Sequence, residues 1–542
     1  MNRRRALAAG AALCLLATAV ALAVVAFGRV TDATPTQALG PPHFVDETST
    51  SGLDHTYDGD FTYAVGGGVA VFECDASGKP DLYLAGGANP AALYRNDTPL
   101  GGDLKFTRIA DPTTDLVGVL GAYPIDFDGD GITDLMVLRK GQSLLLHGLG
   151  DCRFAPAMPF GGPNDWTNAF SATFEPGASL PTLAFGRYLR LDATGQPDLS
   201  YTCADNLLYR PSADGNAYTD PLTLEPGYCS LSMLFSDWDH SGRRDLRVTN
   251  DRQYYTNGQD QLWRMAAGQP PRLYTDADGW VNLQIWGMGI ASFDLGGKGY
   301  PDVFLTSQGD NKLQTLAAGP DQPRYRDMAL RRGVNAAQPF TGGDVRASTA
   351  WHPEFQDVNN DGFIDLFVSK GNVSSMPDYA SRDPSNLFLG QPDGTFVEAA
   401  EEAGVLNFDR GRGAALADFA MDGQLDLIEL NYGAPVRVWR NVGSSAGHWL
   451  GVRLNQPGPN RDAIGAWLEI QVGKTTLRRE LSIGGGHAGG QLGWTHFGLG
   501  PASEVQVRVE WPDGEVSPWL KVKANQFVTL DRASGQAGAW NP

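Results

Sequence analysis

A nine-residue acidic motif that recurs along the chain constrains the fold more than any other feature of the sequence. The pattern is D-x-D-x-D-G-x-x-D between two apolar segments, and its best copies are DFDGDGITD at 126–134 and DVNNDGFID at 357–365. A third copy, DWDHSGRRD, spans 237–245, and weaker copies lie at 73–81, 294–302 and 418–426. The copies recur at roughly 55–60 residues, with one double gap, which is typical of a repeat architecture.

The double gap between 134 and 237 predicts one further repeat whose acidic loop has been lost. The segment FEPGASLPTLAFGRYL lies there, and it brings the number of repeats to seven. Each repeat carries short apolar segments, such as LMVLR at 135–139 and LFVSK at 366–370, separated by Gly and Asp turns. Four short strands per repeat without helical periodicity predict an all-β fold, a seven-bladed β-propeller.

The acidic loops have the chemistry of calcium sites. Calcium takes six to eight oxygen ligands, and a tight loop with acids at positions 1, 3, 5 and 9 and a carbonyl at position 7 can surround one ion. The loop is not an EF-hand, because position 12 is a strand residue such as Val137 and not the required Glu. One loop alone could be an Asx turn that holds a hairpin, but the repetition favours an ion site.

The predicted Ca²⁺ ligands come from five loops. In the loop at 294–302, Gly296 and Lys298 occupy ligand positions, so the lysine ammonium is expected there in place of an ion. The predicted ligands are Asp126, Asp128, Asp130, the Ile132 carbonyl and Asp134; Asp357, Asn359, Asp361, the Phe363 carbonyl and Asp365; Asp237, Asp239, Ser241, the Arg243 carbonyl and Asp245; Glu73, Asp75, Ser77 and Asp81; and Asp418, Asp422 and Asp426.

The loops and their flanking strands, V-A-V-F and D-L-Y-L, resemble the FG-GAP or VCBS repeats of the integrin α-chain propeller. The C-terminal segments HWLGVRL (448–454), NRDAIGAWLEI (460–470), THFGLG (495–500), VEWPDGE (509–515) and ANQFVTL (524–530) resemble the ASPIC/UnbV domain. The combination is similar to the bacterial relatives of cartilage acidic protein 1. This resemblance implies an extracytoplasmic calcium-binding propeller with adhesive or interaction roles, and it implies no reaction.

The sequence also predicts domain boundaries. Residues 1–30 place three arginines before a long uncharged run, which is typical of a signal peptide or of an uncleaved membrane anchor. A linker is expected at 31–44, the propeller at 45–445, a small β-sandwich-like domain at 446–533 and a tail at 534–542. Alternation of apolar residues with period two, as at Leu450, Val452 and Leu454, supports strands in the second domain.

Charge and cysteine content limit the cellular compartments and the kinds of partner that suit this chain. The net charge of −20 is unsuited to nucleic acid, which is bound through Lys and Arg. Four cysteines follow the N-terminal segment, Cys74, Cys152, Cys203 and Cys229, and an even number in an exported chain predicts disulfides, with three pairings open. We expect an exported monomer, periplasmic, extracellular or tethered to a membrane, that binds calcium and a protein or glycan partner.

The sequence predicts no enzyme, since it contains no H-E-x-x-H zinc motif and its eight histidines are scattered. The alternative is an extracytoplasmic enzyme or a natural-product biosynthesis accessory protein, with a pocket between the propeller and the C-terminal domain. Residues 460–465 are expected as a structural turn and 484–490 as a flexible glycine-rich loop. The candidates to line a pocket are His448, Trp449, Asn460, Arg461, Asp462, His487 and His496.

Overall fold

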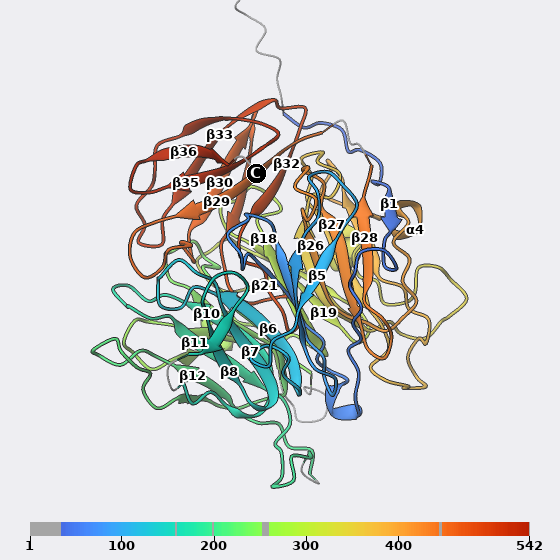
Figure 1. The fold of residues 1–542 in the computed structure, drawn as a ribbon, viewed down its shortest axis with the longest axis vertical. Helices are drawn as coiled ribbons and strands as arrows, with labels where there is room; N and C mark the ends of the chain where they lie inside the picture. The colour runs from blue at the N-terminus through green and yellow to red at the C-terminus, as the bar shows by residue number, and fades with distance from the viewer. Residues whose placement is uncertain (1–33, 158–159, 198–199, 252–258, 444–446, 541–542) are drawn as a thin grey trace, which may run out of the picture.

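The computed structural model describes residues 34–157, 160–197, 200–251, 259–443 and 447–540. In this part of the chain, strands β1 to β28 form seven antiparallel units of four strands (Figure 1). Pairing between β7 and β10 joins the second and third units into one larger sheet. The predicted all-β propeller is confirmed.

The units follow one another along the chain, and each runs from an inner strand to an outer one. They are β2 (Val69–Phe72), β3 (Asp81–Leu84), β4 (Ala92–Asn96), β5 (Phe106–Ile109); β6 (Val119–Ile125), β7 (Asp134–Gln142), β8 (Leu144–Gly148), β9 (Phe154–Pro156); β10 (Asn164–Thr173), β11 (Thr182–Arg187), β12 (Asn206–Tyr209), β13 (Leu222–Leu224); β14 (Ser230–Ser236), β15 (Asp245–Asn250), β16 (Gln261–Arg264), β17 (Arg272–Leu273); β18 (Gly287–Phe293), β19 (Asp302–Ser307), β20 (Lys312–Leu316), β21 (Tyr325–Asp327); β22 (Ala350–Gln356), β23 (Asp365–Lys370), β24 (Asn386–Gly390), β25 (Phe396–Glu398); and β26 (Gly411–Ala417), β27 (Asp426–Asn431), β28 (Arg437–Asn441), β1 (Phe44–Asp46).

The inner strands form a closed ring. Each of β2, β6, β10, β14, β18, β22 and β26 contacts the next, and β26 contacts β2 again. The last unit closes the ring with the first part of the chain through hydrogen bonds, because β1 pairs with β28 and supplies its outer strand. Helical structure in the described residues is confined to single turns, which are η1 (Phe61–Tyr63), η2 (Asp276–Asp278), α3 (Ala329–Arg332) and α4 (Ala400–Ala403).

The C-terminal domain consists of two four-stranded sheets around a separate apolar core, which agrees with the predicted β-sandwich-like domain. In this domain β29 pairs with β35 in parallel, whereas every other pair of named strands in the described chain is antiparallel. The predicted tail is wrong at 536–540, which form the edge strand β36. The sheets are β32 (Thr495–Gly500), β29 (His448–Asn455), β35 (Gln526–Asp531), β36 (Gln536–Trp540); and β31 (Thr475–Glu480), β30 (Trp467–Val472), β33 (Glu504–Glu510), β34 (Leu520–Lys523).

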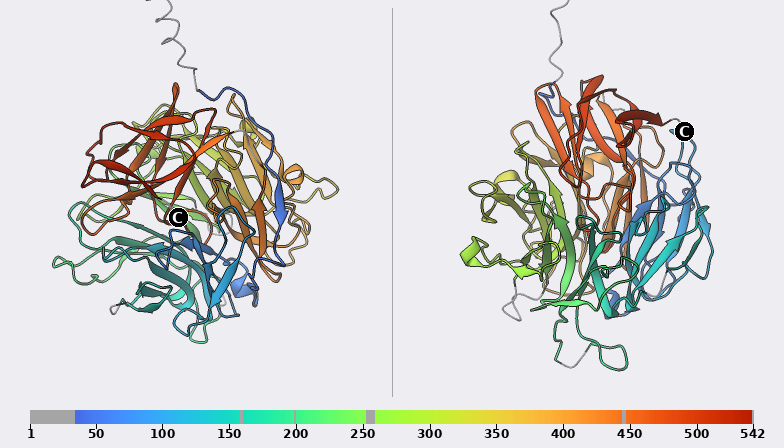
Figure 2. Two further views of the ribbon diagram at one scale, coloured as in Figure 1. Left: turned by 45° about the horizontal axis from the view of Figure 1, so that its top comes forward. Right: turned by 90° about the vertical axis from the view of Figure 1, so that its left-hand side faces the viewer.

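The glycine-rich segment between β31 and β32 inserts among the inner strands of the propeller. It makes backbone bridges to β2, β6, β10, β14 and β18, and the amide of Ala122 donates to the carbonyl of Ala488 (3.1 Å). Glycines allow this close approach: a Cβ on Gly121 would lie 1.8 Å from the same carbonyl. The expectation of a flexible loop at 484–490 is therefore wrong, because the backbone of this segment forms hydrogen bonds with the backbone of the inner strands. Figures 1 and 2 show the C-terminal domain, in red, against the propeller.

Two disulfides form, Cys74–Cys152 and Cys203–Cys229. The first links the acidic loop of the first unit to the second unit, and the second closes a local loop. Both fit an oxidising compartment. Within the described residues, no helix is long and apolar enough to cross a membrane. The predicted signal peptide or anchor at 1–30 lies outside those residues.

Candidate functional site

All the acidic loops occupy the same place in their units, between the inner strand and the second strand. The closing aspartate is the first residue of the second strand, and in the loops at 73–81, 126–134, 357–365 and 418–426 backbone amides hold its carboxylate from two sides. Asp134, for example, accepts hydrogen bonds from the amides of Phe127 (3.0 Å) and Gly148 (2.6 Å), and Asp365 is held in the same way. The loop conformation is therefore fixed by hydrogen bonds within each unit.

The first acid of each loop is held by the amides that follow it. Asp126 accepts from Gly129 (2.8 Å) and Gly131 (3.0 Å), and Asp357 accepts from Gly362 (2.7 Å). The glycine at position 6 takes a positive φ, +89° at Gly131, which explains why this position is glycine in each copy. In the loop at 126–134, the side chains at positions 1, 3 and 5 bring oxygens within 4.8 Å of one another.

Three units carry their own cation beside the acidic groups. Lys298 Nζ lies 2.7 Å from Asp302 Oδ1, as the sequence predicts for this loop. In the loop at 237–245, the guanidinium of Arg243 contacts Asp245 (2.8 Å) and Asp239 (3.4 Å). Asp245 also accepts from Trp238 and Tyr274, so its oxygens are already saturated. This arrangement weakens the case for calcium at 237–245.

The third such unit is the one whose acidic motif is lost. Glu175 stands in the loop between β10 and β11, and the guanidinium of Arg210 contacts its carboxylate at 2.6 Å. The amide of Gly268, from the next unit, also donates to Glu175. The repeat predicted from the double gap is thus present in the fold, with an ion pair at the position of the acidic loop.

Two loops hold carboxylates with no ion pair to a basic side chain in the described chain, namely 357–365 and 418–426. Burial, together with the negative charge of Asp422, raises the pKa of Asp418 to about 8. Burial also raises the pKa values of Asp357 and Asp365, and neighbouring carboxylates add to both. Buried acids that repel one another are the groups that a divalent cation would neutralise.

The loop at 126–134 resembles these two but has a histidine beside it. Asp126, Asp128 and Asp130 bring oxygens within 4.8 Å of one another, and so do Asp128 and Asp134 with a ring nitrogen of His147. Burial raises the pKa of Asp126 to about 6, and the Asp462 carboxylate adds to the shift. Sequence reasoning missed His147 because strand pairing alone brings β8 to the loop. Alignment of the repeats through their third strands could have found it.

The loop at 73–81 shares features with both groups of loops, those with an ion pair and those without one. Its first acid, Glu73, forms an ion pair with Arg453 of the C-terminal domain (2.9 Å), while burial raises the pKa of the closing Asp81 to about 7. Asp75 and Ser77 contribute a local turn, in which the Asp75 carboxylate accepts from the Ser77 amide (3.0 Å). A basic side chain from another domain thus reaches the rim of this loop.

The C-terminal domain rests on all six acidic loops. His496 Nε2 lies 2.7 Å from Asn360 Oδ1, in the loop at 357–365. Gly129 and Gly423 pack so closely against Pro459 and Trp449 that an added Cβ would lie 2.6 Å and 1.9 Å from them. Further hydrogen bonds join Trp494 Nε1 to the Gly78 carbonyl (2.8 Å), Arg478 to the Gly297 carbonyl (3.1 Å) and the Asp237 amide to Glu480 (2.9 Å).

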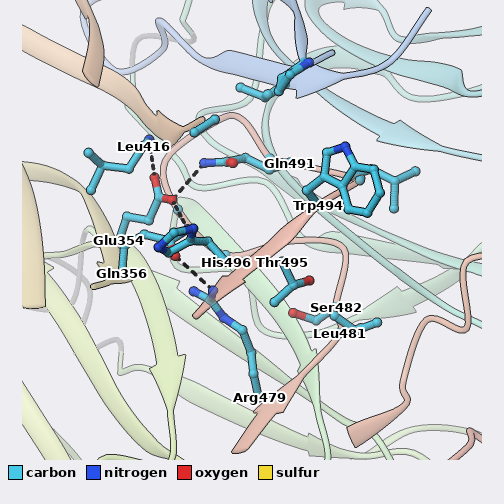
Figure 3. A pocket seen from close by; sticks show the side chains of 18 of the residues that line it. Glu354, Gln356, Leu416, Arg479, Leu481, Ser482, Gln491, Trp494, Thr495 and His496 are labelled. Carbon is cyan, nitrogen blue, oxygen red and sulfur yellow. Dashed lines mark hydrogen bonds between the residues drawn. The ribbon is translucent and has the colours of Figure 1, made fainter. Parts of the chain in front are cut away.

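A cavity of about 230 Å³ lies between the two domains, beside the inserted segment. Glu354, from β22, accepts hydrogen bonds from Gln356 and Gln491 (both 2.8 Å), and Arg479 donates to Gln356 (3.1 Å) (Figure 3). His496 also lines the cavity, and burial lowers its pKa to about 3. The cavity is therefore lined by titratable groups from both domains.

Comparison with known proteins agrees with this architecture. The FG-GAP-like repeat family matches residues 74–137 and 357–429, and the ASPIC and UnbV family matches residues 456–537. The chain thus carries FG-GAP-like repeats in its propeller and resembles ASPIC and UnbV proteins in its C-terminal domain. The matched propeller ranges lie in the first two and the last two units, and the third range covers most of the C-terminal domain.

Cartilage acidic protein 1 from Homo sapiens is 47% identical over 228 residues, which is 39% of this chain and 31% of that protein. The protein of the same name from Xenopus tropicalis is 40% identical over 238 residues, 40% of this chain and 33% of that protein. The matches thus span about a third of the length of these relatives. The solved structure titled "Structure of Dos1 propeller" is 10% identical, with a TM-score of 0.32, and covers 75% of this chain and 95% of that one.

The remaining candidates of the ASPIC/UnbV domain divide between structural roles and the cavity. Asn460 is a turn residue, since its side chain exchanges hydrogen bonds with Ile464. Trp449 packs against Phe527, with ring centroids 4.8 Å apart. His487 is fully buried within the inserted segment, whereas Asp462 lines the cavity with His496. His448 contacts Asn525 on the surface, and Arg461 packs over Gly131.

Proposed function

We propose that this chain is an exported interaction module whose FG-GAP propeller is stabilised by Ca²⁺ in its acidic loops. The observation that carries the proposal is the set of buried carboxylates at 357–365 and 418–426, which no basic side chain of the described chain pairs with. Charges buried without a partner are costly, and a bound cation relieves that cost. The residues present suit calcium, because they offer carboxylate, amide and carbonyl oxygens on a tight loop.

In this proposal the ions have a structural role. The ASPIC/UnbV domain covers the loops, so a partner has little access to them from outside. Calcium would hold each loop in the shape on which the second domain rests, and would thereby link the stability of the propeller to the docking of that domain. Ion binding to the folded state alone stabilises it by linkage.

The partner surface is proposed on the opposite face of the propeller. Because strands alternate in direction, the loops that enter each inner strand open on the face away from the acidic loops. These loops expose apolar side chains, including Phe61 (47% exposed), Val117 (53%) and Val345 (82%). Exposed apolar groups on a rigid scaffold favour binding to a protein or a glycan. Export is supported by the two disulfides and by the basic and apolar N-terminal segment.

Calorimetric titration of residues 31–542 with Ca²⁺ tests the proposal, together with melting in calcium and in EDTA. We expect two to five bound ions and a clear fall in melting temperature on chelation. No binding and no shift would mean that the loops are turns only. Partner screens belong in calcium buffer, and Val345→Asp provides a variant that should lose binding without losing calcium.

The interdomain cavity supports a second candidate function, an extracytoplasmic enzyme or a natural-product biosynthesis accessory protein. Its lining includes polar groups from both domains, and small-molecule sites occur preferentially at such domain interfaces. A thermal-shift screen of small polar compounds tests this function, with Ser482→Leu as the blocked control, since Ser482 lines the cavity. A hit that stabilises both proteins equally would argue against the cavity.

A further inference from the structure

The residue that faces the closing aspartate from the third strand differs among the units. In five units the amide of a residue at the end of the third strand, or directly after it, donates to this aspartate: Asn96, Gly148, Met265, Gly390 and Asn441. The preceding residue therefore occupies an equivalent position in each unit. Those residues are Arg95, His147, Arg264, Leu389 and Arg440. Among these five, His147 alone can bind a metal ion.

His147 is in place to act as a ligand. Its Nδ1 lies 3.0 Å from Asp134 Oδ1 and 3.4 Å from Asp128 Oδ2, and its Nε2 lies 3.9 Å from Asp130 Oδ2. Ligand atoms bound to one ion at about 2.0–2.2 Å are separated by roughly 3 Å, so the spacing of these three atoms suits a common ion. The side chains are partly open to solvent, with 29% of His147 and 33% of Asp128 exposed, which leaves a path for ion entry.

We propose that the loop at 126–134 and His147 together form a mixed imidazole–carboxylate site for a divalent transition-metal ion of the zinc type. Calcium takes oxygen ligands, whereas imidazole nitrogen favours Zn²⁺, Co²⁺ and related ions over Ca²⁺. The corresponding residue of the loop at 357–365 is Leu389, which leaves that loop with oxygen ligands alone. The two loops then differ in metal preference although they share one backbone. The inference rests on the proposed function only in that the loop surrounds an ion.

The competing explanation is that His147 supplies a positive charge near the acids, at a position where three of the other units carry an arginine. The variant His147→Arg separates the two explanations, because it keeps a cation at this position and removes the nitrogen ligand. His147→Gln removes both the charge and the ring. The side chain is partly exposed, so neither variant should unfold the protein, and melting in EDTA checks this point.

The experiment is titration of the purified protein with Co²⁺ and Zn²⁺ in the presence of saturating Ca²⁺. We expect the wild type to bind one Co²⁺ and to show a visible absorption band that is absent from both variants, since they lack the imidazole ligand. We also expect the wild type to bind Zn²⁺ at least tenfold more tightly than His147→Arg or His147→Gln. Equal affinity in the three proteins, or no Co²⁺ band in the wild type, would overturn the site.

Calcium titration of the same proteins distinguishes this inference from the proposed function. If Ca²⁺ binds at the other loops and raises the melting temperature, but His147 does not affect Zn²⁺ binding, the mixed site alone is wrong. If Co²⁺ binds through His147 and Ca²⁺ neither binds nor stabilises, the mixed site stands and the calcium proposal fails.

Discussion

The loops at 357–365 and 294–302 have the same backbone arrangement but neutralise their carboxylates differently. In both loops the amide of the glycine at position 6 donates a hydrogen bond to the first acid (2.7 Å in each), and the closing aspartate begins the second strand. The loop at 294–302 contains Lys298, whose ammonium contacts Asp302. The loop at 357–365 has Asp361 at the position of that lysine, and no cation pairs with it among the described residues.

This difference shows that the acidic loop is a scaffold separable from its cation. The hydrogen bonds from loop amides to the first acid persist where Lys298 or Arg243 supplies the charge. A loop with an internal ammonium or guanidinium is neutralised when the chain folds. On the proposed function, a loop of carboxylates would instead depend on a bound cation. The propeller would then combine ion-dependent and ion-independent units in one ring.

The largest expected effect comes from removing one closing aspartate in each class. Asp365→Asn should remove one bound Ca²⁺ and its linked stabilisation, which is about 2.7 kcal/mol when free calcium is 100 times Kd. Asp302→Asn is the matched control: it should destabilise the protein equally in calcium and in EDTA, since Lys298 loses its partner in both. Calcium titration and urea unfolding of the two variants measure this. An equal loss of calcium dependence in both variants would show that the two classes of loop do not differ in their need for calcium.

The pH dependence of the metal-free protein should be the next largest effect. Burial raises the pKa of Asp126 to about 6 and that of Asp418 to about 8, above the value of about 3.9 for an unfolded aspartate. The folded state therefore binds these protons more tightly, so the free energy of unfolding should fall as pH rises from about 4 to 8 in EDTA.

Saturating calcium should reverse this trend, because the carboxylates are then charged and paired, and the stabilisation by calcium should grow through the same pH window. Urea unfolding at pH 5, 6, 7 and 8, with and without calcium, measures both curves. Parallel curves would show that the carboxylates are not the groups that calcium neutralises.

The sequence predicts the propeller and the acidic loops well because both are encoded locally. Each loop forms from nine consecutive residues, and the period of the motif fixes the number of units even where Glu175 and Arg210 have replaced the acids. Contacts between distant segments were beyond such reasoning. His147 reaches its loop through strand pairing, and the insertion of 484–490 depends on inner strands contributed by five units. Glycine richness fits a flexible loop and a tightly packed insert equally, and only the surrounding backbone decides between them.

The smallest expected effect, and the sharpest test of the comparison, is to convert one class of loop into the other. Lys298→Asp would give the loop at 294–302 carboxylates at positions 1, 5 and 9, as in the loop at 418–426, on a backbone that is already formed. We expect one additional weakly bound Ca²⁺ and a lower melting temperature in EDTA, since the ion pair with Asp302 is lost. Lys298→Ala is the control, which should lose the ion pair and gain no ion. If Lys298→Asp binds no more calcium than Lys298→Ala, three carboxylates at positions 1, 5 and 9 are not enough to hold an ion on this backbone.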